Sequence, residues 1–336
     1  MSQPKLRVGV LGAASIAPMA LLRPAREVGE VEVTKVAARD PARAGVFARK
    51  HGIAGVSPSY EALITDPEVD AVYNPLPNAL HALWTIRALE AGKHVLCEKP
   101  FTANEEEAKQ VAEVAARTRL VAMEAFHWRY HPLAARMREI VTGGELGRVR
   151  RIETAMCIPL PLPGDIRYRL DLAGGATMDT GCYAISMLRH LAGAEPTVER
   201  AEARLSSPGV DRWMQAEVRF DDGVTGSITC SLWSSTLLSI RARVEGELGT
   251  MDVFNPVVPQ IYHHLTVTTG AGRRRERLPR VSTYACQLRA FAGAVQRGEP
   301  LLTGPDDAVK NMRVVDAVYR AAGLPLRTGP EIAKRL

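Results

Sequence analysis

Residues 6–17 read LRVGVLGAASIA, a short apolar run followed by a glycine and small residues that open a helical stretch. A strand that turns tightly at glycine into a helix is the pattern at which a Rossmann fold binds dinucleotide phosphates. The usual fingerprint has three glycines, of which only Gly12 is present, with alanine at the other two positions. We expect a strained but usable turn, in which Gly12, Ala14, Ser15 and Ile16 bind the cofactor through backbone N–H groups. The alternative is a purely structural turn.

The rest of the first 125 residues continues this alternation of strand and helix. VEVTKVAA (31–38), DAVYNPLP (70–77) and HVLCEKP (94–100) are short apolar runs separated by longer helical stretches. Such βαβ repeats are typical of a parallel sheet that helices cover on both faces. We therefore predict a doubly wound α/β Rossmann domain over residues 1–125.

The pattern changes after His131, where strands follow one another closely. An amphipathic helix ends near Gly143–Gly144, and strand-like runs then extend from RVRRIETAMCI (148–158) to LTVTT (265–269), with Asp222–Gly223 as a hairpin turn. Two helical stretches, near 284–296 and 306–321, close the chain. We predict an α+β domain over 126–336 with an open, mostly antiparallel sheet, whose free face could bury against cofactor, domain or another subunit.

Composition excludes several classes of protein. A chain of 336 residues with 46% hydrophobic and 24% charged residues is typical of a globular protein with two cores. The net charge of +6 is spread over scattered arginines, which favours an anionic ligand over nucleic acid. Five widely spaced cysteines without a CxxC pair indicate reduced thiols. No apolar run reaches the length of a signal-peptide core or membrane span, so we expect a cytoplasmic protein without a membrane partner.

The end of the second predicted strand carries a side chain that selects the cofactor. Arg39 stands 27 positions after Gly12, where an acidic residue would bind the ribose 2′-hydroxyl of NAD. An arginine there accommodates the 2′-phosphate of NADP, with Arg43 one helical turn further on to assist. We expect NADP(H) to be preferred and NAD(H) to remain possible; the alternative is a solvated arginine before a helix capped by Asp40.

Two groups of residues are candidates for the chemistry. Lys99 follows the strand HVLC, at the edge of a parallel sheet where ligands bind, and its ammonium could donate to the reacting oxygen. Further on, GGATMDTGCY (174–183) places Asp179 and Tyr183 four positions apart, on one face of a helix. A phenol can relay a proton and a carboxylate can bind a sugar hydroxyl. The alternatives are a surface lysine, a helix-capping aspartate and a core tyrosine.

With these residues in view, the chain resembles the Gfo/Idh/MocA oxidoreductase family. The resemblance rests on GAASIA, on YNPLPN (73–78) with His81, on AGKHVLCEKP (91–100) and on GGATMDTGCY, and it covers nearly the whole chain. Tyrosine at position 183, where inositol dehydrogenases carry histidine, resembles the branch with glucose–fructose oxidoreductase, dimeric dihydrodiol and xylose dehydrogenases, and sugar 3-ketoreductases.

The resemblance implies roles for further residues. It places Leu76, Asn78 and His81 along the cofactor, Glu98 and Lys99 at the nicotinamide, and Arg167 near cofactor or substrate. It also implies a cis Lys99–Pro100 bond, a proton-donor role for Tyr183, and a homodimer or homotetramer formed through the open sheet.

The combined expectation is an NADP-preferring oxidoreductase that moves hydride between nicotinamide and a sugar or sugar-like alcohol or carbonyl. A dihydrodiol dehydrogenase and a non-catalytic NADP-sensing regulator are the alternatives. We expect no metal, because the histidines lack carboxylates or thiols at ligand spacing. Specificity is expected in the loops 159–164 and 254–262, which no spacing rule decodes.

Overall fold

The computed structural model describes residues 4–162 and 164–330, and Pro163 of the predicted specificity loop lies outside them. The chain divides into two compact units: unit 1 comprises residues 4–127, 284–309 and 329–330, and unit 2 comprises 128–283 and 310–328. This division differs from the contiguous domains expected from the sequence, because the segment after residue 283 returns to unit 1. Thr303 Oγ1 donates to the Glu124 carbonyl at 2.7 Å, and the rings of Tyr284 and His127 lie 4.0 Å apart.

Unit 1 is built on a parallel sheet, as predicted. Its strands are β1 (Leu6–Leu11), β2 (Val31–Ala37), β3 (Gly55–Val56), β4 (Ala71–Asn74), β5 (His94–Cys97) and β6 (Ala122–Glu124), in the order β3-β2-β1-β4-β5-β6. All four residues of β4 are buried, which fits a strand covered on both faces. The order reverses direction between β1 and β4, and ligands of such sheets bind at the carboxyl ends of the strands near this point.

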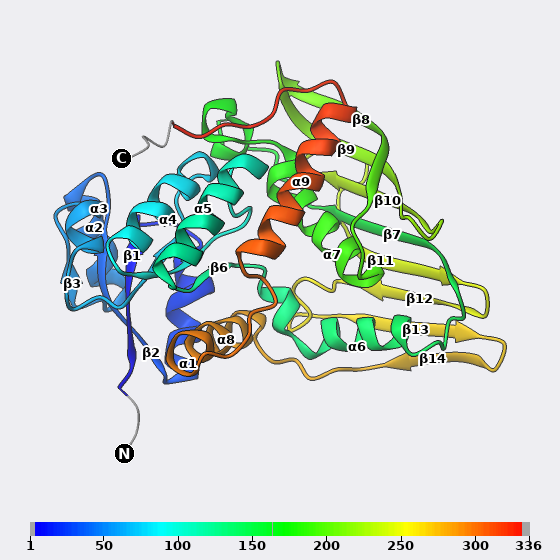
Figure 1. Ribbon diagram of the computed structural model, residues 1–336, viewed down its shortest axis with the longest axis horizontal. Coiled ribbons are helices and arrows are strands. Elements are labelled where there is room, and N and C mark those ends of the chain that lie inside the picture. The colour runs from blue at the N-terminus through cyan, green and yellow to red at the C-terminus, as the bar shows by residue number, and fades with distance from the viewer. Residues whose placement is uncertain (1–3, 163, 331–336) are drawn as a thin grey trace. The chain divides into compact units, whose positions relative to one another are not determined.

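Side-chain caps mark the starts of several helices of unit 1. They are α1 (Arg23–Val28), α2 (Pro41–His51), α3 (Tyr60–Ile64), α4 (His81–Glu90), α5 (Glu105–Thr118) and α8 (Thr283–Arg297), whose first residue belongs to unit 2 (Figure 1). In α2 the Asp40 carboxylate accepts from Ala42 N at 2.9 Å. In α5 the Asn104 side chain accepts from Glu107 N while Glu107 accepts from Ala103 N, a reciprocal cap. None of the helices in residues 4–162 and 164–330 is long and apolar enough to cross a membrane.

Unit 2 contains the predicted open sheet of mostly antiparallel strands. They are β7 (Val149–Cys157), β8 (Thr197–Ser207), β9 (Val210–Arg219), β10 (Thr225–Ser231), β11 (Ser239–Gly246), β12 (Gly249–Phe254), β13 (His264–Thr269) and β14 (Gly272–Glu276), in the order β14-β13-β12-β11-β7-β10-β9-β8. Only β7 and β10 pair in parallel. The turn at Asp222–Gly223 joins β9 to β10 as predicted, whereas β14 was not predicted because GRRRE has no apolar alternation.

The two faces of this sheet differ in character. Helix α7 (Cys182–Ala192) packs on one face, where Thr154 Oγ1 donates to the Ala184 carbonyl at 2.9 Å. Alternation along β7 turns Arg151 and Glu153 to the other face, where Arg151 pairs with Glu153 at 2.9 Å and with Glu217 of β9 at 3.2 Å. The open face therefore carries a ladder of partly exposed charges.

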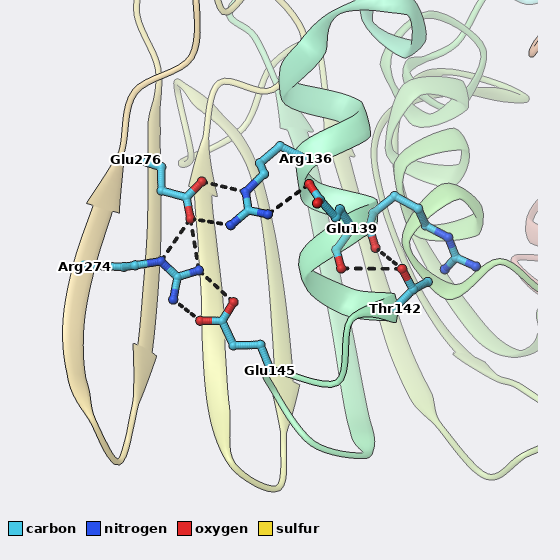
Figure 2. Close-up of polar contacts among 7 residues, drawn as sticks. Arg136, Glu139, Thr142, Glu145, Arg274 and Glu276 are labelled. Carbon is cyan, nitrogen blue, oxygen red and sulfur yellow. Dashed lines mark hydrogen bonds and ion pairs between the residues drawn. The ribbon is translucent and has the colours of Figure 1, made fainter.

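Helix α6 (Pro132–Thr142) is held to the sheet by ion pairs at its edge (Figure 2). Arg136 donates to both carboxylate oxygens of Glu276 at 2.7 and 2.9 Å, and to Glu139 at 2.9 Å. Arg274 bridges Glu276 and Glu145. We call these five residues the edge network.

Candidate active site

The glycine turn after β1 fits a dinucleotide phosphate. Gly12 has a φ of +93°, and a Cβ there would lie 3.2 Å from Leu76 Cδ2, so both backbone and space favour glycine. Its N–H donates to the Ala37 carbonyl at 2.6 Å, whereas the N–H groups of residues 13–16 donate to no acceptor among the described residues. These donors, at the start of a helical run, suit an anion.

Neither of the two alanines adopts the left-handed backbone that would favour glycine. Ala17 has a φ of −56° and is fully buried, and Ala14 is not among the described non-glycine residues with positive φ. A helical φ costs alanine nothing, so the helix start at Ala17 does not require the third glycine.

Arg39 lies exposed beyond the end of β2, beside the same turn. Arg43 donates to the Ala13 carbonyl at 3.2 Å and so ties the first turn of α2 to the glycine turn. Sequence reasoning missed Tyr60, whose hydroxyl would lie 3.8 Å from a Cβ at Gly12. Burial raises the pKa of Tyr60, and the positive charge of Arg39 opposes this shift. The Tyr60 phenol thus lies close to Gly12 and interacts with Arg39.

His81 holds two loops of unit 1 together. Its Nδ1 lies 2.7 Å from the Pro100 carbonyl oxygen and its Nε2 lies 2.6 Å from that of Leu76. Burial, opposed by the two carbonyls and aided by the charge of Lys99, lowers the pKa of His81 to about 4. A neutral imidazole donates from one ring nitrogen only, so His81 donates to one of these carbonyls and lies close to the other, between the loops of Leu76 and Pro100. Asn78 begins a short 3₁₀ turn just before it.

The loop that carries Lys99 is fixed on each side of the lysine. The Glu98 N–H donates to the Asn74 carbonyl at 3.0 Å, and the Phe101 N–H donates to Glu124 Oε1 at 2.9 Å. The Lys99–Pro100 bond is cis, as the family resemblance implied. Lys99 therefore leaves the carboxyl end of β5 from a rigid backbone, which is what a group acting on a reacting atom requires.

Glu98 is held by a tyrosine from the neighbouring strand. Tyr73 Oη donates to Glu98 Oε1 at 2.6 Å. Burial raises the pKa of Tyr73 well above its usual value, and the Glu98 carboxylate adds to this. Tyr284 of α8 is also buried and feels the same charge, which further raises its pKa. Tyr73 thus binds the carboxylate next to Lys99, and Tyr284 lies within its electrostatic influence. Tyr73 stands in the YNPLPN motif, but Tyr284 had no sequence signal.

Arg167 and Asp179, which are predicted site residues of unit 2, form an ion pair. Arg167 Nε lies 3.1 Å from Asp179 Oδ2, and its Nη1 lies 3.1 Å from Asp165 Oδ1. Burial lowers the pKa of Arg167, but the Asp179 and Asp165 carboxylates outweigh this effect and raise it. The resulting charged cluster offers donors and acceptors suited to hydroxyl groups.

Tyr183 follows Asp179 along one helical run. A π-helical turn over Thr177–Gly181 leads directly into α7, which begins at Cys182. Tyr183 is 6% exposed. Single π turns of this kind are frequent at functional sites, because they change the direction of side chains within a helix. The predicted site residues are thus divided: the cofactor set and Lys99 lie in unit 1, while Arg167, Asp179 and Tyr183 lie in unit 2.

Comparison with known families assigns both parts of the chain. Residues 6–126 match the GFO/IDH/MocA model described as an oxidoreductase family with an NAD-binding Rossmann fold, and residues 134–252 match the GFO/IDH/MocA C-terminal domain. The chain belongs to the Gfo/Idh/MocA oxidoreductase family. The family predicted from GAASIA, YNPLPN, EKP and GGATMDTGCY is confirmed.

Several relatives of this family member match over almost the full length. A D-xylose 1-dehydrogenase (NADP(+)) from Haloferax volcanii is 37% identical over 316 residues, covering 94% of this chain and 96% of that one. A dTDP-3,4-didehydro-2,6-dideoxy-alpha-D-glucose 3-reductase from Streptomyces violaceoruber is 35% identical, covering 95% and 96%. The structure of KijD10, a 3-ketoreductase from Actinomadura kijaniata in complex with NADP and TDP-benzene, has a TM-score of 0.87 at 32% identity, covering 95% and 98%.

This member of the Gfo/Idh/MocA family is therefore an oxidoreductase with an NAD-binding Rossmann domain. The described residues bring together no group of three or more His, Cys, Asp or Glu side chains placed to hold a metal ion.

Proposed function

We propose that the protein is an NADP-preferring oxidoreductase that transfers hydride between the nicotinamide and a sugar or sugar-like alcohol or carbonyl. The observation that carries the proposal is the fixed loop around Lys99, held by Asn74, His81 and Glu124 at the carboxyl end of β5. Relatives named as an NADP(+)-dependent xylose dehydrogenase and a dTDP-sugar 3-reductase support the substrate class.

Each residue then has a defined part in the reaction. Bound NADP(H) supplies or accepts the hydride. The N–H groups after Gly12 bind its phosphates, Arg39 pairs with the 2′-phosphate, and Leu76, Asn78, His81 and Glu98 shape the remaining site. Tyr183 exchanges a proton with the reacting oxygen, and the Lys99 ammonium stabilises the charge that develops there. Asp179 and Arg167 bind neighbouring hydroxyls.

Replacing Lys99 tests this assignment most directly. Lys99→Ala is expected to lower kcat by about 10²–10⁴-fold, the usual contribution of a positioned proton-transfer group. NADPH affinity, measured by fluorescence titration, should stay close to that of the unchanged protein. Lys109→Ala, at an exposed position of α5 in the same unit, is the matched control. Undiminished turnover in Lys99→Ala would remove Lys99 from the chemistry.

Arg39→Ala tests the cofactor preference. Loss of a charge-assisted bond to phosphate is expected to raise the KM for NADP at least about tenfold. The KM for NAD should change little, since NAD has no 2′-phosphate. Arg49→Ala, further along the exposed side of α2, serves as the control. Equal effects on both cofactors would show that Arg39 does not bind the 2′-phosphate.

A substrate screen separates the remaining candidates. Aldoses, ketosugars, nucleotide sugars and trans-dihydrodiols should each be assayed with NADP(H) and NAD(H) at 340 nm. A trans-1,2-dihydrobenzene-1,2-diol dehydrogenase from Sus scrofa, 33% identical over 68% of this chain, makes the dihydrodiol the second candidate. NADPH binding without turnover of any of these substrates would favour a non-catalytic NADP-sensing regulator.

We also propose that the chain forms a homodimer or homotetramer through the open face of the unit 2 sheet. The charged ladder supports this, because Arg151 and Arg243 each pair with two carboxylates and leave few charges uncompensated. Light scattering of the unchanged protein and of Arg243→Glu measures the effect, and an unchanged mass in the variant would refute an interface on this face.

A further inference from the structure

We propose that the buried ion pair between Asp211 and Arg327 is a positioning device, which fixes the Gly174–Thr177 turn and thereby aims Arg167, Asp179 and Tyr183. This inference rests on the proposed function, since it assigns those three residues to the reaction. Both side chains of the pair are 0% exposed, and they come from the two separate segments of unit 2, 116 positions apart. Neither was singled out from the sequence.

Asp211, at the start of β9, acts on the helix that carries Asp179 and Tyr183. Its Oδ2 accepts from both the N–H and the Oγ1 of Thr177, each at 2.7 Å. Thr177 is the first residue of the π-helical turn, so Asp211 caps this helical run from strand β9. A shift of the carboxylate would move the helix start, two residues before Asp179.

Arg327, in the segment after α9 (Pro305–Ala321), completes the arrangement. Its Nη2 donates to Asp211 Oδ1 at 3.0 Å, and its Nε donates to the Gly174 carbonyl at 2.7 Å. The guanidinium lies over the Tyr319 ring, 4.1 Å from its centre, and Tyr319 Oη donates to the same Asp211 oxygen at 3.0 Å. The Arg327 guanidinium thus joins Asp211, which caps the helical run at Thr177, to the Gly174–Thr177 turn.

The Gly174–Thr177 turn has no room for a side chain at position 175. A Cβ on Gly175 would lie 2.2 Å from Asp211 Oδ1 and 2.9 Å from Arg327 Nη2. The same turn holds the loop of Arg167, because the Gly175 N–H donates to the Arg167 carbonyl and the Gly174 N–H donates to that of Arg169, both at 2.8 Å. The ion pair is therefore connected through backbone bonds to both partners of the Arg167–Asp179 contact.

These contacts give the pair a role beyond stability. A fully buried charge pair contributes little net free energy compared with apolar residues, because desolvation offsets the attraction. Its directional bonds, by contrast, define one arrangement of the turn. Misplacement of a reacting group by about 1 Å can lower a rate by about 10²-fold. We therefore assign Asp211 and Arg327 as positioning residues.

The test compares Arg327→Lys and Asp211→Asn with the unchanged enzyme. Lysine keeps the charge but loses the planar fork, and asparagine keeps the shape but loses the charge. Both variants are expected to lower kcat by at least about tenfold per NADPH-binding site, with NADPH affinity unchanged. Arg320→Lys, at an exposed position of α9, is the matched control and should retain full activity.

Hydrogen exchange supplies a second measurement that does not depend on turnover. Amides of residues 174–183 should exchange faster in Arg327→Lys, while the strands of unit 1 keep their protection. Faster exchange together with a kcat within about twofold of the unchanged enzyme, below the tenfold loss expected of misplaced groups, would overturn the positioning role. Unchanged exchange would also overturn it, because the turn would then not depend on the pair. A lack of turnover in the unchanged protein, with NADPH bound, would instead refute the proposed function.

Discussion

Two ion-pair clusters of unit 2 place the same chemical groups in opposite surroundings. Asp211 and Arg327 are fully buried, and their other bonds end on backbone groups and on the hydroxyls of Thr177 and Tyr319. In the edge network, the side chain of Arg274 is 41% exposed and that of Glu276 20% exposed, and the partners are other charged side chains (Figure 2). The Asp211–Arg327 pair connects backbone segments, whereas the edge network connects helix α6 to the edge strand β14.

The difference shows what each cluster contributes. Water screens the edge network, so each of its pairs adds less than about 1 kcal/mol and adjusts easily to the loss of one member. The buried pair cannot adjust, because removing one charge leaves the other without solvent. A displacement of either partner of the buried pair is therefore costly. This cost holds the attached turn in one arrangement, which suits a turn beside a proposed reaction site.

The largest expected effect is the loss of the buried guanidinium. Arg327→Met leaves Asp211 buried and uncompensated, and should lower the free energy of unfolding of unit 2 by about 3–5 kcal/mol. Urea unfolding followed by tryptophan fluorescence measures it, since Trp128, Trp213 and Trp233 lie in unit 2. Arg274→Met, the same substitution in the edge network, should cost less than about 1 kcal/mol. Equal losses would remove the distinction between the clusters.

A smaller effect is expected when the space around the buried pair is filled. Gly175→Ala forces a Cβ against Asp211 Oδ1 at a φ of +139°, and should cost about 2–4 kcal/mol from overpacking and backbone strain together. Gly223→Ala, at a φ of +86° with no atom within 4 Å, isolates the backbone cost, at about 1–2 kcal/mol. Both are measured by the same urea unfolding. A Gly175→Ala variant no less stable than Gly223→Ala would mean that the turn can move away from the ion pair.

The sequence predicted the parts of the site that depend on local pattern. The strand–turn–helix at Gly12, the position of Lys99 after an apolar strand, and the hairpin at Asp222–Gly223 all follow from short-range rules, and the structure contains each of them. Asp179 and Tyr183 were predicted from their spacing and from the family resemblance, and their part in the site stays a prediction. Local pattern is sufficient here because a parallel sheet places the ends of its strands along one edge.

The remaining features depend on contacts between distant segments. Arg327 and Asp211 are 116 positions apart, and no spacing rule joins a residue after the last helix to the start of β9. The return of α8 to unit 1 was missed for the same reason, since it depends on Thr303 reaching Glu124. Strand β14 was missed because GRRRE has no apolar alternation, and the contact of its Arg274 with Glu145 joins residues 129 positions apart.

The smallest expected effect concerns the response of the edge network to acid. Hydrogen bonds from Arg136 and Arg274, against the opposing effect of burial, lower the pKa of Glu276 to about 2. Because the folded pKa lies below the unfolded value, the stabilisation is complete above about pH 4.5 and is lost as the pH falls towards about 2. Glu276→Gln removes this dependence, so its stability should fall less than that of the unchanged protein between pH 5 and 3, by roughly 1 kcal/mol at low salt. Thermal unfolding at each pH, repeated in about 1 M NaCl to screen the exposed charges, measures the difference. A difference that persists in high salt would show that the edge network behaves as a buried cluster, and the contrast with Asp211 and Arg327 would then be one of position alone.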